Sequence, residues 1–204
     1  MISAADALAR LRDGNRRFVA GDMTDQALSN RERRALALDQ FPFAIVLGCS
    51  DSRVPAELVF DQGFGDLFVI RVAGNIVAPS QVGSVEFAAA KFGTKLVVVM
   101  GHSSCGAITA AVEEILDGAK PESRNLSSIV DRVRPSVEAV IAGRHDVDRK
   151  TLIRESAIAN VRASVNHLRH GSALLEKLIQ NEGLVIVGAK YSLDTGVVTF
   201  LDER

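Results

Sequence analysis

The residues with the most evident chemistry in this sequence lie in two short segments. Residues 48–53 read GCSDSR and residues 101–106 read GHSSCG, and together they hold both cysteines of the chain. Thiolate and imidazole ligands favour zinc, whereas magnesium and calcium prefer oxygen ligands. If the two segments meet in the fold, Cys49, His102 and Cys105 can bind one zinc ion.

Three protein ligands leave a fourth position on a tetrahedral zinc ion. Asp51 is the candidate for that position because it follows Cys49 by two residues, but Arg53 can instead hold its carboxylate in a bidentate pair. With Asp51 on the metal, as the fourth ligand, the site is closed. With Asp51 paired to Arg53, the fourth position is open to water, as in catalytic zinc sites.

Two thiolate ligands cancel the formal charge of the zinc ion, so it is a weaker Lewis acid than a zinc ion held by three histidines. Zinc lowers the pKa of a bound water to about 7 in the best case, and we expect a higher value here. Activity should therefore rise toward alkaline pH. A freed Asp51 can accept a hydrogen bond from the zinc-bound hydroxide and orient it for attack.

Simpler interpretations of the same residues remain open. Cys49 and Cys105 can be buried inert thiols, a disulfide, or ligands of a structural zinc ion. Each residue taken singly favours one of these interpretations. The combination of two cysteines, a histidine and an Asp-Arg pair favours a catalytic metal site.

The elements expected to position these residues form an alternating pattern. Apolar runs typical of strands buried on both faces occur at residues 43–47, 67–70, 95–100 and 184–187, and a fifth run at 197–201 suits an edge strand. Helical patterns occupy residues 80–92, 105–116 and 125–181, the last with breaks expected at Pro135 and Gly143. The pattern predicts an α/β fold, with a central, mostly parallel sheet of four strands plus an edge strand, flanked by helices.

Both chemical segments directly follow an expected strand, and ligands in such folds bind beyond the carboxyl ends of the strands. Residues 1–40 read instead as helices, over about 3–21 and 25–38, with little apolar surface of their own. We therefore expect one domain over residues 1–204, with a helical N-terminal arm (1–40) and an α/β core (41–204). The arm should pack against the core or a partner subunit.

Composition narrows the function classes. The chain has 204 residues, 47% of them hydrophobic, and a formal net charge of −1. This composition is globular and gives no electrostatic case for a nucleic-acid partner. The apolar runs are too short to span a bilayer, and two cysteines exclude a disulfide scaffold. We expect a cytoplasmic protein with reduced thiols and no membrane partner.

The two chemical segments resemble the signature motifs of the β-class carbonic anhydrases. Residues 60–63 (FDQG), 67–75 (LFVIRVAGN), 83–87 (GSVEF) and 187–191 (VGAKY) match in order, so the resemblance covers about residues 40–201. It implies a carbonate dehydratase, a zinc lyase that reversibly hydrates carbon dioxide to bicarbonate and a proton. It implies one zinc ion per subunit on Cys49, His102 and Cys105, with Asp51 and Arg53 as catalytic residues. It also implies a homodimer or homotetramer with active sites near the subunit interface.

The resemblance also suggests a subtype and a substrate-binding set. Gln40 stands nine residues before Cys49, where the permanently active, pea-type (type I-like) enzymes have glutamine, and its amide can stabilise a substrate oxygen. Phe68 suits an apolar pocket wall, Phe87 stands where many plant-like members have tyrosine, and Gly106 flanks the ligand Cys105. We expect Gln40, Phe68, Phe87 and Gly106 to bind substrate.

The bicarbonate-inhibited subtype carries a tryptophan, an arginine and a tyrosine in its inhibitory pocket. Arg71 and Tyr191 match two of these residues, but Val46 replaces the tryptophan, which favours the pea-type subtype. Two rival functions remain open: a zinc hydrolase for a carbon dioxide analogue such as carbon disulfide, and a non-catalytic zinc or redox sensor. The presence of both Asp51 and Arg53 argues against a sensor, which needs no such pair.

Overall fold

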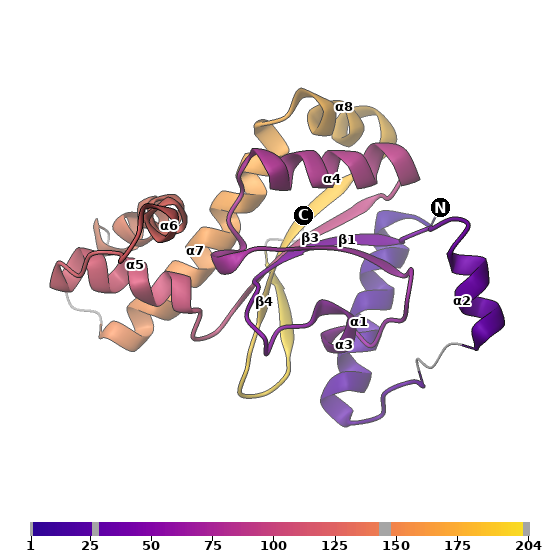
Figure 1. Cartoon of the computed structure of the whole chain (residues 1–204), viewed down its shortest axis with the longest axis horizontal. Helices are drawn as coiled ribbons and strands as arrows, with labels where there is room; N and C mark the ends of the chain where they lie inside the picture. Colours follow the sequence, from indigo (N-terminus) through magenta and orange to yellow (C-terminus); the bar gives the residue numbers. More distant parts are fainter. Residues whose placement is uncertain (1, 26–28, 143–147, 202–204) are drawn as a thin grey trace.

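The computed structural model describes residues 2–25, 29–142 and 148–201 and builds them around one five-stranded sheet (Figure 1). The strand order is β2-β1-β3-β4-β5, with four parallel strands and β5 antiparallel to β4. The bounds are β1 (Ala44–Gly48), β2 (Leu67–Arg71), β3 (Leu96–His102), β4 (Val185–Tyr191) and β5 (Val198–Leu201). The expected fold class is therefore confirmed, including the edge strand.

Helices connect the strands and cover the sheet. In chain order they are α1 (Ala4–Ala20), α2 (Asn30–Leu36), α3 (Ala56–Val59), α4 (Pro79–Phe92), α5 (Gly106–Asp117), α6 (Arg124–Ala142), α7 (Arg149–His170) and α8 (Ala173–Glu182), with a 3-10 turn at Ala73–Asn75. None of these described helices combines the length and the hydropathy needed to cross a membrane.

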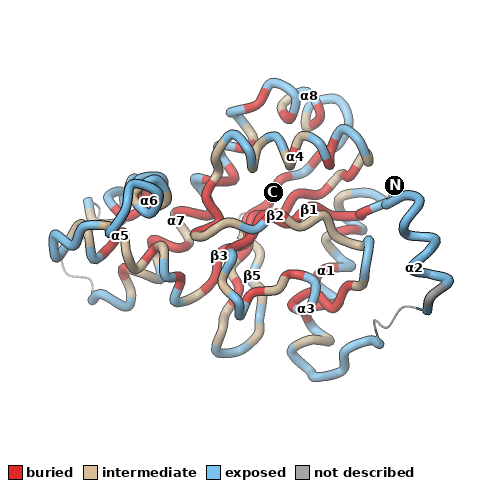
Figure 2. The backbone as a smooth tube through the Cα atoms, viewed as in Figure 1, coloured by how far each residue is buried: buried red, intermediate tan, exposed pale blue. Residues whose placement is uncertain are grey.

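The sheet is buried on both faces, which explains its continuous apolar strands. Alternate side chains of a strand point to opposite faces, so Val46 packs on the side of α1 and α3, while Ile45 and Leu47 pack on the side of α4, α7 and α8. Figure 2 shows the buried backbone concentrated in these central strands. A third apolar cluster joins α5, α6 and the first half of α7 and includes Cys49 and Cys105.

The N-terminal arm divides into two parts. Helix α1 packs on the core of its own chain, with Ala7 and Leu11 fully buried. The buried Asn15 fixes it further, because its amide donates to the carbonyl oxygens of Val59 and Gly196 and accepts from the backbone N–H of Val198. Helix α2 is shorter than the expected 25–38 and stands apart from the core in Figure 1.

The long C-terminal helical region differs from the sequence expectation at Pro135. Helix α6 continues through this proline and ends at Ala142. Proline lacks an N–H, so the carbonyl of Asp131 loses its helical partner; both residues are exposed, which leaves that carbonyl accessible to water. The second expected break, Gly143, lies outside the described residues.

Candidate metal centre

Two adjacent strands bring the cysteines and the histidine together. Strands β1 and β3 pair in parallel, with Gly48 opposite Met100, so they end at the same edge of the sheet. Cys49 directly follows β1, His102 ends β3, and Cys105 directly precedes α5. Their donor atoms all lie within 4.8 Å of one another, and all three residues are buried. The structure therefore confirms that the two chemical segments meet.

The short turn between His102 and Cys105 places two donors at one point. Ser104 has a left-handed backbone, with φ of 55°, which reverses the chain before α5 begins. The neighbouring Ser103 ties the turn to the end of β4: its N–H donates to the carbonyl of Tyr191, and its hydroxyl accepts from the N–H of Leu193, each at 2.9 Å. The strand-to-helix turn is thus held on both sides.

The imidazole of His102 is oriented as a metal ligand. Its Nδ1 lies 2.9 Å from the carbonyl oxygen of Ser103, and because a carbonyl can only accept, Nδ1 carries the proton. The buried Nε2 is then an acceptor, and it has no hydrogen-bond partner among the described residues. Buried polar atoms rarely lack a partner. A metal ion held by Nε2 and two thiolates supplies one, and this arrangement is typical of zinc.

The two thiols influence each other's pKa. A hydrogen bond from Cys105 lowers the pKa of the Cys49 thiol, and the same hydrogen bond, together with burial, raises the pKa of the Cys105 thiol. Cys49 Sγ also accepts the backbone N–H of Gly74 at 3.4 Å. Cys49 is therefore the thiol stabilised as a thiolate, and metal binding must displace a proton from Cys105.

Asp51 is held by Arg53 beside the three donors. Arg53 donates from Nε to Asp51 Oδ1 at 2.9 Å and from Nη2 to Oδ2 at 2.7 Å, and these hydrogen bonds hold the pKa of the Asp51 carboxyl well below its usual range. Asp51 Oδ2 lies 3.9 Å from His102 Nε2. The Asp51 carboxylate thus lies next to the three donors but is hydrogen-bonded to the Arg53 guanidinium. This arrangement corresponds to the open site expected from the sequence, in which Asp51 is paired with Arg53 and is not a metal ligand.

Arg71 has a role that the sequence did not suggest. Its guanidinium donates to the carbonyl oxygens of Cys49 at 2.9 Å and of Asp51 at 2.6 Å, so it holds the backbone of the loop after β1. Tyr191 is also committed to the fold: it is buried, pairs with His102 in the sheet, and its ring lies 6.4 Å from that of Phe18. The only sequence signal for these two residues was their match to the bicarbonate-inhibited subtype.

The expected substrate-binding residues divide into two groups. Gly106 begins α5 directly after the donor Cys105. Phe68 pairs with Ile45, four residues before Cys49 on β1, which places it roughly 13 Å toward the opposite end of the sheet. Phe87 is exposed, with its ring centroid 6.2 Å from that of Phe68.

Gln40 precedes β1, whereas Cys49 follows this strand, so the two residues lie at opposite ends of β1. Gln40 is exposed and lines a cavity with Phe64 and residues of the α2 region. The structure therefore does not bring Gln40, Phe68 or Phe87 to the three donors within one chain. Their expected role in substrate binding stays a prediction.

The fold and the site together define a class: an α/β protein with a buried Cys-His-Cys metal centre at the carboxyl edge of a parallel sheet. Beside the three donors, Asp51 is paired with Arg53. A zinc ion on the three donors would then keep a fourth position without a protein ligand, which is typical of catalytic zinc rather than structural zinc.

Comparisons with known proteins name the family. Residues 44–198 match the family model described as carbonic anhydrase. The chain is 40% identical over 193 residues to carbonic anhydrase 2 of Mycobacterium tuberculosis, covering 95% of this chain and 90% of that protein. It is 37% identical over 188 residues to the carbonic anhydrase of Mycolicibacterium smegmatis, covering 92% of this chain and 88% of that protein.

Solved structures agree with the sequence comparison. A β-carbonic anhydrase of the fungus Sordaria macrospora superposes with a TM-score of 0.74 at 26% identity, covering 84% of this chain and 86% of that one. The chain therefore belongs to the β-class carbonic anhydrase family. The enzymes of this family are zinc lyases, and Cys49, His102 and Cys105 form the grouping that fits the metal.

Proposed function

We propose that this protein catalyses the zinc-dependent, reversible hydration of carbon dioxide to bicarbonate and a proton. One observation carries the proposal: three buried donor atoms lie together beside the Asp51 carboxylate, and Arg53 holds this carboxylate by two hydrogen bonds. A zinc ion bound to Cys49, His102 and Cys105 supplies a water of lowered pKa at a free fourth position.

Asp51 and Arg53 act on the nucleophile from the protein side. The Asp51 carboxylate is ionised by its hydrogen bonds to Arg53, so it can only accept hydrogen bonds and can orient a hydroxyl group beside His102. Arg53 prevents the carboxylate from turning to the metal. Asp51 and Arg53 are paired in the structure, and Val46 replaces the tryptophan of the bicarbonate-inhibited subtype. For these two reasons we propose that the protein is of the permanently active, pea-type subtype.

We propose that Gln40, Phe68 and Phe87 serve the metal centre of a partner subunit. Strand β2 is an edge of the sheet in the described chain, and Phe87, on the adjoining helix, is 53% exposed. Phe41 and Phe64, in the segments that precede β1 and β2, expose 70% and 72% of their surface. Exposed aromatic side chains of this kind suit a surface that a partner subunit covers. The Sordaria macrospora relative is described as tetrameric, and a homodimer or homotetramer fits these surfaces.

Two further expectations remain part of the proposal. Residues 1–204 act as one domain, since α1 packs on the sheet that carries the metal centre. A cytoplasmic location keeps both cysteines reduced and able to bind metal, whereas an oxidising compartment favours their pairing.

Isotope exchange tests the proposal. Zinc-loaded protein should accelerate the loss of ¹⁸O from labelled bicarbonate, and the zinc-stripped protein should not until zinc is restored. Carbon disulfide hydrolysis should be measured on the same samples. Full zinc occupancy without ¹⁸O loss contradicts hydration, and carbon disulfide turnover in that sample supports the rival hydrolase.

A further inference from the structure

The backbone of Gly74 contacts the thiol of Cys49 from outside the two chemical segments. The N–H of Gly74 donates to Cys49 Sγ at 3.4 Å from the 3-10 turn at Ala73–Asn75. Gly74 has a φ of 69°, and a Cβ there would lie 2.9 Å from the Cβ of Ala107. Glycine alone therefore fits the conformation and the close approach that this hydrogen bond needs.

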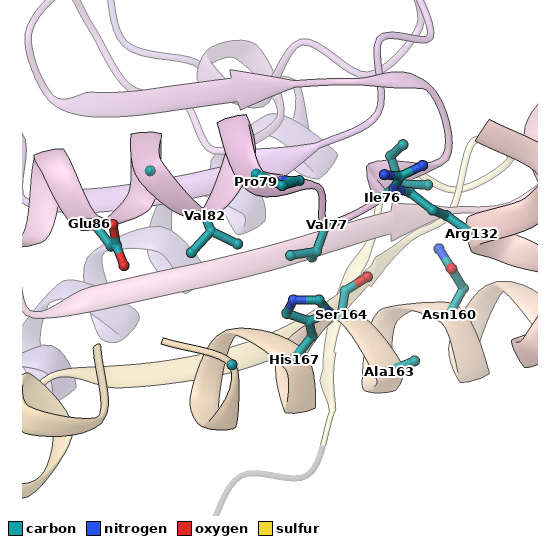
Figure 3. Close-up of a pocket in the computed structure, with 12 residues that line it drawn as sticks. Ile76, Val77, Pro79, Val82, Glu86, Arg132, Asn160, Ala163, Ser164 and His167 are labelled. Atoms are coloured by element: carbon teal, nitrogen blue, oxygen red, sulfur yellow. The ribbon is translucent and has the colours of Figure 1, made fainter. Parts of the chain in front are cut away.

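Helix α7 holds the same turn from the other side. The amide Nδ2 of Asn160 donates to the carbonyl oxygen of Gly74 at 2.8 Å, and one helical turn later the hydroxyl of Ser164 donates to the carbonyl of Asn75 at 3.3 Å. Asn160 is 3% exposed. In Figure 3 both side chains project from α7 toward the segment that carries Ile76. Gly74 is thus fixed at its carbonyl by Asn160 while its N–H faces the thiol.

The helix that carries Asn160 is itself seated on the strands of the metal centre. Val161 lies so close to β3 and β4 that a Cβ at Gly101 would meet it at 2.6 Å and a Cβ at Gly188 at 2.8 Å. Gly101 directly precedes His102. The position of Asn160 is therefore fixed relative to the same strand that presents the imidazole.

We propose that Asn160 is a positioning residue for the metal centre: it holds Gly74 so that the Gly74 N–H stays on Cys49 Sγ. A hydrogen bond to a ligand thiolate withdraws negative charge that the sulfur otherwise donates to the metal, and such partners orient the ligand. The inference rests on the proposed zinc site, and it adds a residue 111 positions from Cys49 that touches neither metal nor substrate.

A cavity beside Asn160 makes the residue testable. A space of about 610 Å³ lies between α4, α6 and α7, and Asn160, Ser164 and Ile76 line it (Figure 3). Water can enter this space when the side chain is shortened, so Asn160→Ala should remove the hydrogen bond without forcing the core to collapse. The same space accommodates the extra methylene of Asn160→Gln, which keeps the amide donor.

Ser156 provides a matched control. It lies one turn before Asn160 on α7 and is fully buried, and its hydroxyl has no hydrogen-bond partner among the described residues. Ser156→Ala therefore removes a buried polar group from the same helix without touching Gly74.

The first measurement is hydrogen exchange of the Gly74 amide in zinc-free protein, followed by NMR. Loss of one hydrogen bond should accelerate exchange roughly five- to tenfold in Asn160→Ala, with little change in Ser156→Ala and near wild-type exchange in Asn160→Gln. Equal exchange in wild type and Asn160→Ala overturns the proposal. If Asn160→Ala does not fold, Asn160→Leu, which has nearly the same volume and no donor, takes its place.

The second measurement concerns the metal. Zinc affinity should fall about tenfold or more in Asn160→Ala, and the thiolate-to-metal charge-transfer band of the cobalt(II) form should shift. Both properties should be unchanged in Ser156→Ala and restored to wild-type values in Asn160→Gln. Equal effects in Asn160→Ala and Ser156→Ala show a general structural role and overturn the proposal. A wild-type protein that binds no zinc contradicts the proposed function instead, and the exchange measurement then still tests whether Asn160 holds Gly74.

Discussion

Arg53 and Asp51 form a two-point pair within one turn of backbone, with Nε on Oδ1 at 2.9 Å and Nη2 on Oδ2 at 2.7 Å. The backbone N–H of Arg53 adds a third hydrogen bond to Oδ1 at 3.0 Å. These three hydrogen bonds therefore hold the Asp51 carboxylate on Arg53, although its Oδ2 lies only 3.9 Å from His102 Nε2. We propose that this arginine decides whether Asp51 binds the metal or orients the nucleophile.

Removing Arg53 should release Asp51 toward the metal. We expect Arg53→Ala to lose roughly 100-fold in hydration rate while zinc stays bound, and X-ray absorption should detect an added oxygen ligand. Arg149→Ala is the matched control because Arg149 makes the same two-point pair with Asp117, at 2.8 and 2.6 Å, on the surface. Wild-type activity in Arg53→Ala, with an unchanged zinc environment, contradicts the proposed role.

The pH profile should rise toward alkaline pH. Hydrogen bonds from Arg53 hold the pKa of Asp51 below its usual value of about 3.9, so the pair is fully formed above that value and is lost only as the pH falls through the lowered one. If zinc binds to the three donors, the acid limb of the hydration rate should therefore come from a water on that zinc, because two thiolates would keep its pKa higher than three histidines would. Rates that are flat from mildly acidic to alkaline pH are incompatible with this account.

The contact between α7 and β3 should be sensitive to a single methyl group. Gly101→Ala places a Cβ 2.6 Å from Val161 Cγ2 and should lower the free energy of unfolding by about 1–3 kcal/mol. In the double variant Gly101→Ala/Val161→Ala, the total loss should be smaller than the sum of the two single losses. Gly83→Ala, where a Cβ meets nothing within 4 Å, is the control and should be neutral or stabilising. Additive losses, measured by urea denaturation, contradict the close contact.

Mixed subunits test whether Gln40 acts across an interface. Gln40→Ala and Asp51→Ala homo-oligomers should each be impaired. In a mixed dimer of the two variants, a Gln40 that serves its partner leaves one site with both native residues, so activity should recover to about half of that of the wild type. A Gln40 that serves its own chain leaves both sites impaired, and the mixture stays as inactive as its parents.

Much of the fold followed from the sequence because its strands are buried on both faces. The runs at 43–47 and 95–100 end two residues before Cys49 and His102. Parallel strands end at one edge of a sheet, so these two residues were expected to meet if the two strands were neighbours, and the structure shows that they are. The helix break expected at Pro135 was wrong, because an exposed helix face tolerates a missing N–H.

The residues that hold the backbone around the metal centre could not be predicted from sequence patterns. Asn160 is an isolated polar residue within a mixed helical pattern, and nothing in its spacing indicates that its amide reaches Gly74, 86 residues away. Arg71 lay within a matching segment, but its hydrogen bonds to the carbonyls of Cys49 and Asp51 depend on the path of the loop. Gln40, Phe68 and Phe87 lie away from the metal centre of their own chain. A single sequence does not show whether such a residue contributes to the site of its own subunit or to that of a partner.

The most direct test is stopped-flow carbon dioxide hydration at alkaline pH with zinc quantified in the same sample. The account predicts rapid hydration by the wild type at one zinc ion per subunit. Asp51→Ala should keep its zinc through Cys49, His102 and Cys105 and lose most of the hydration rate. A wild type with full zinc occupancy and no hydration, or an Asp51→Ala variant that hydrates carbon dioxide at the wild-type rate, would contradict it.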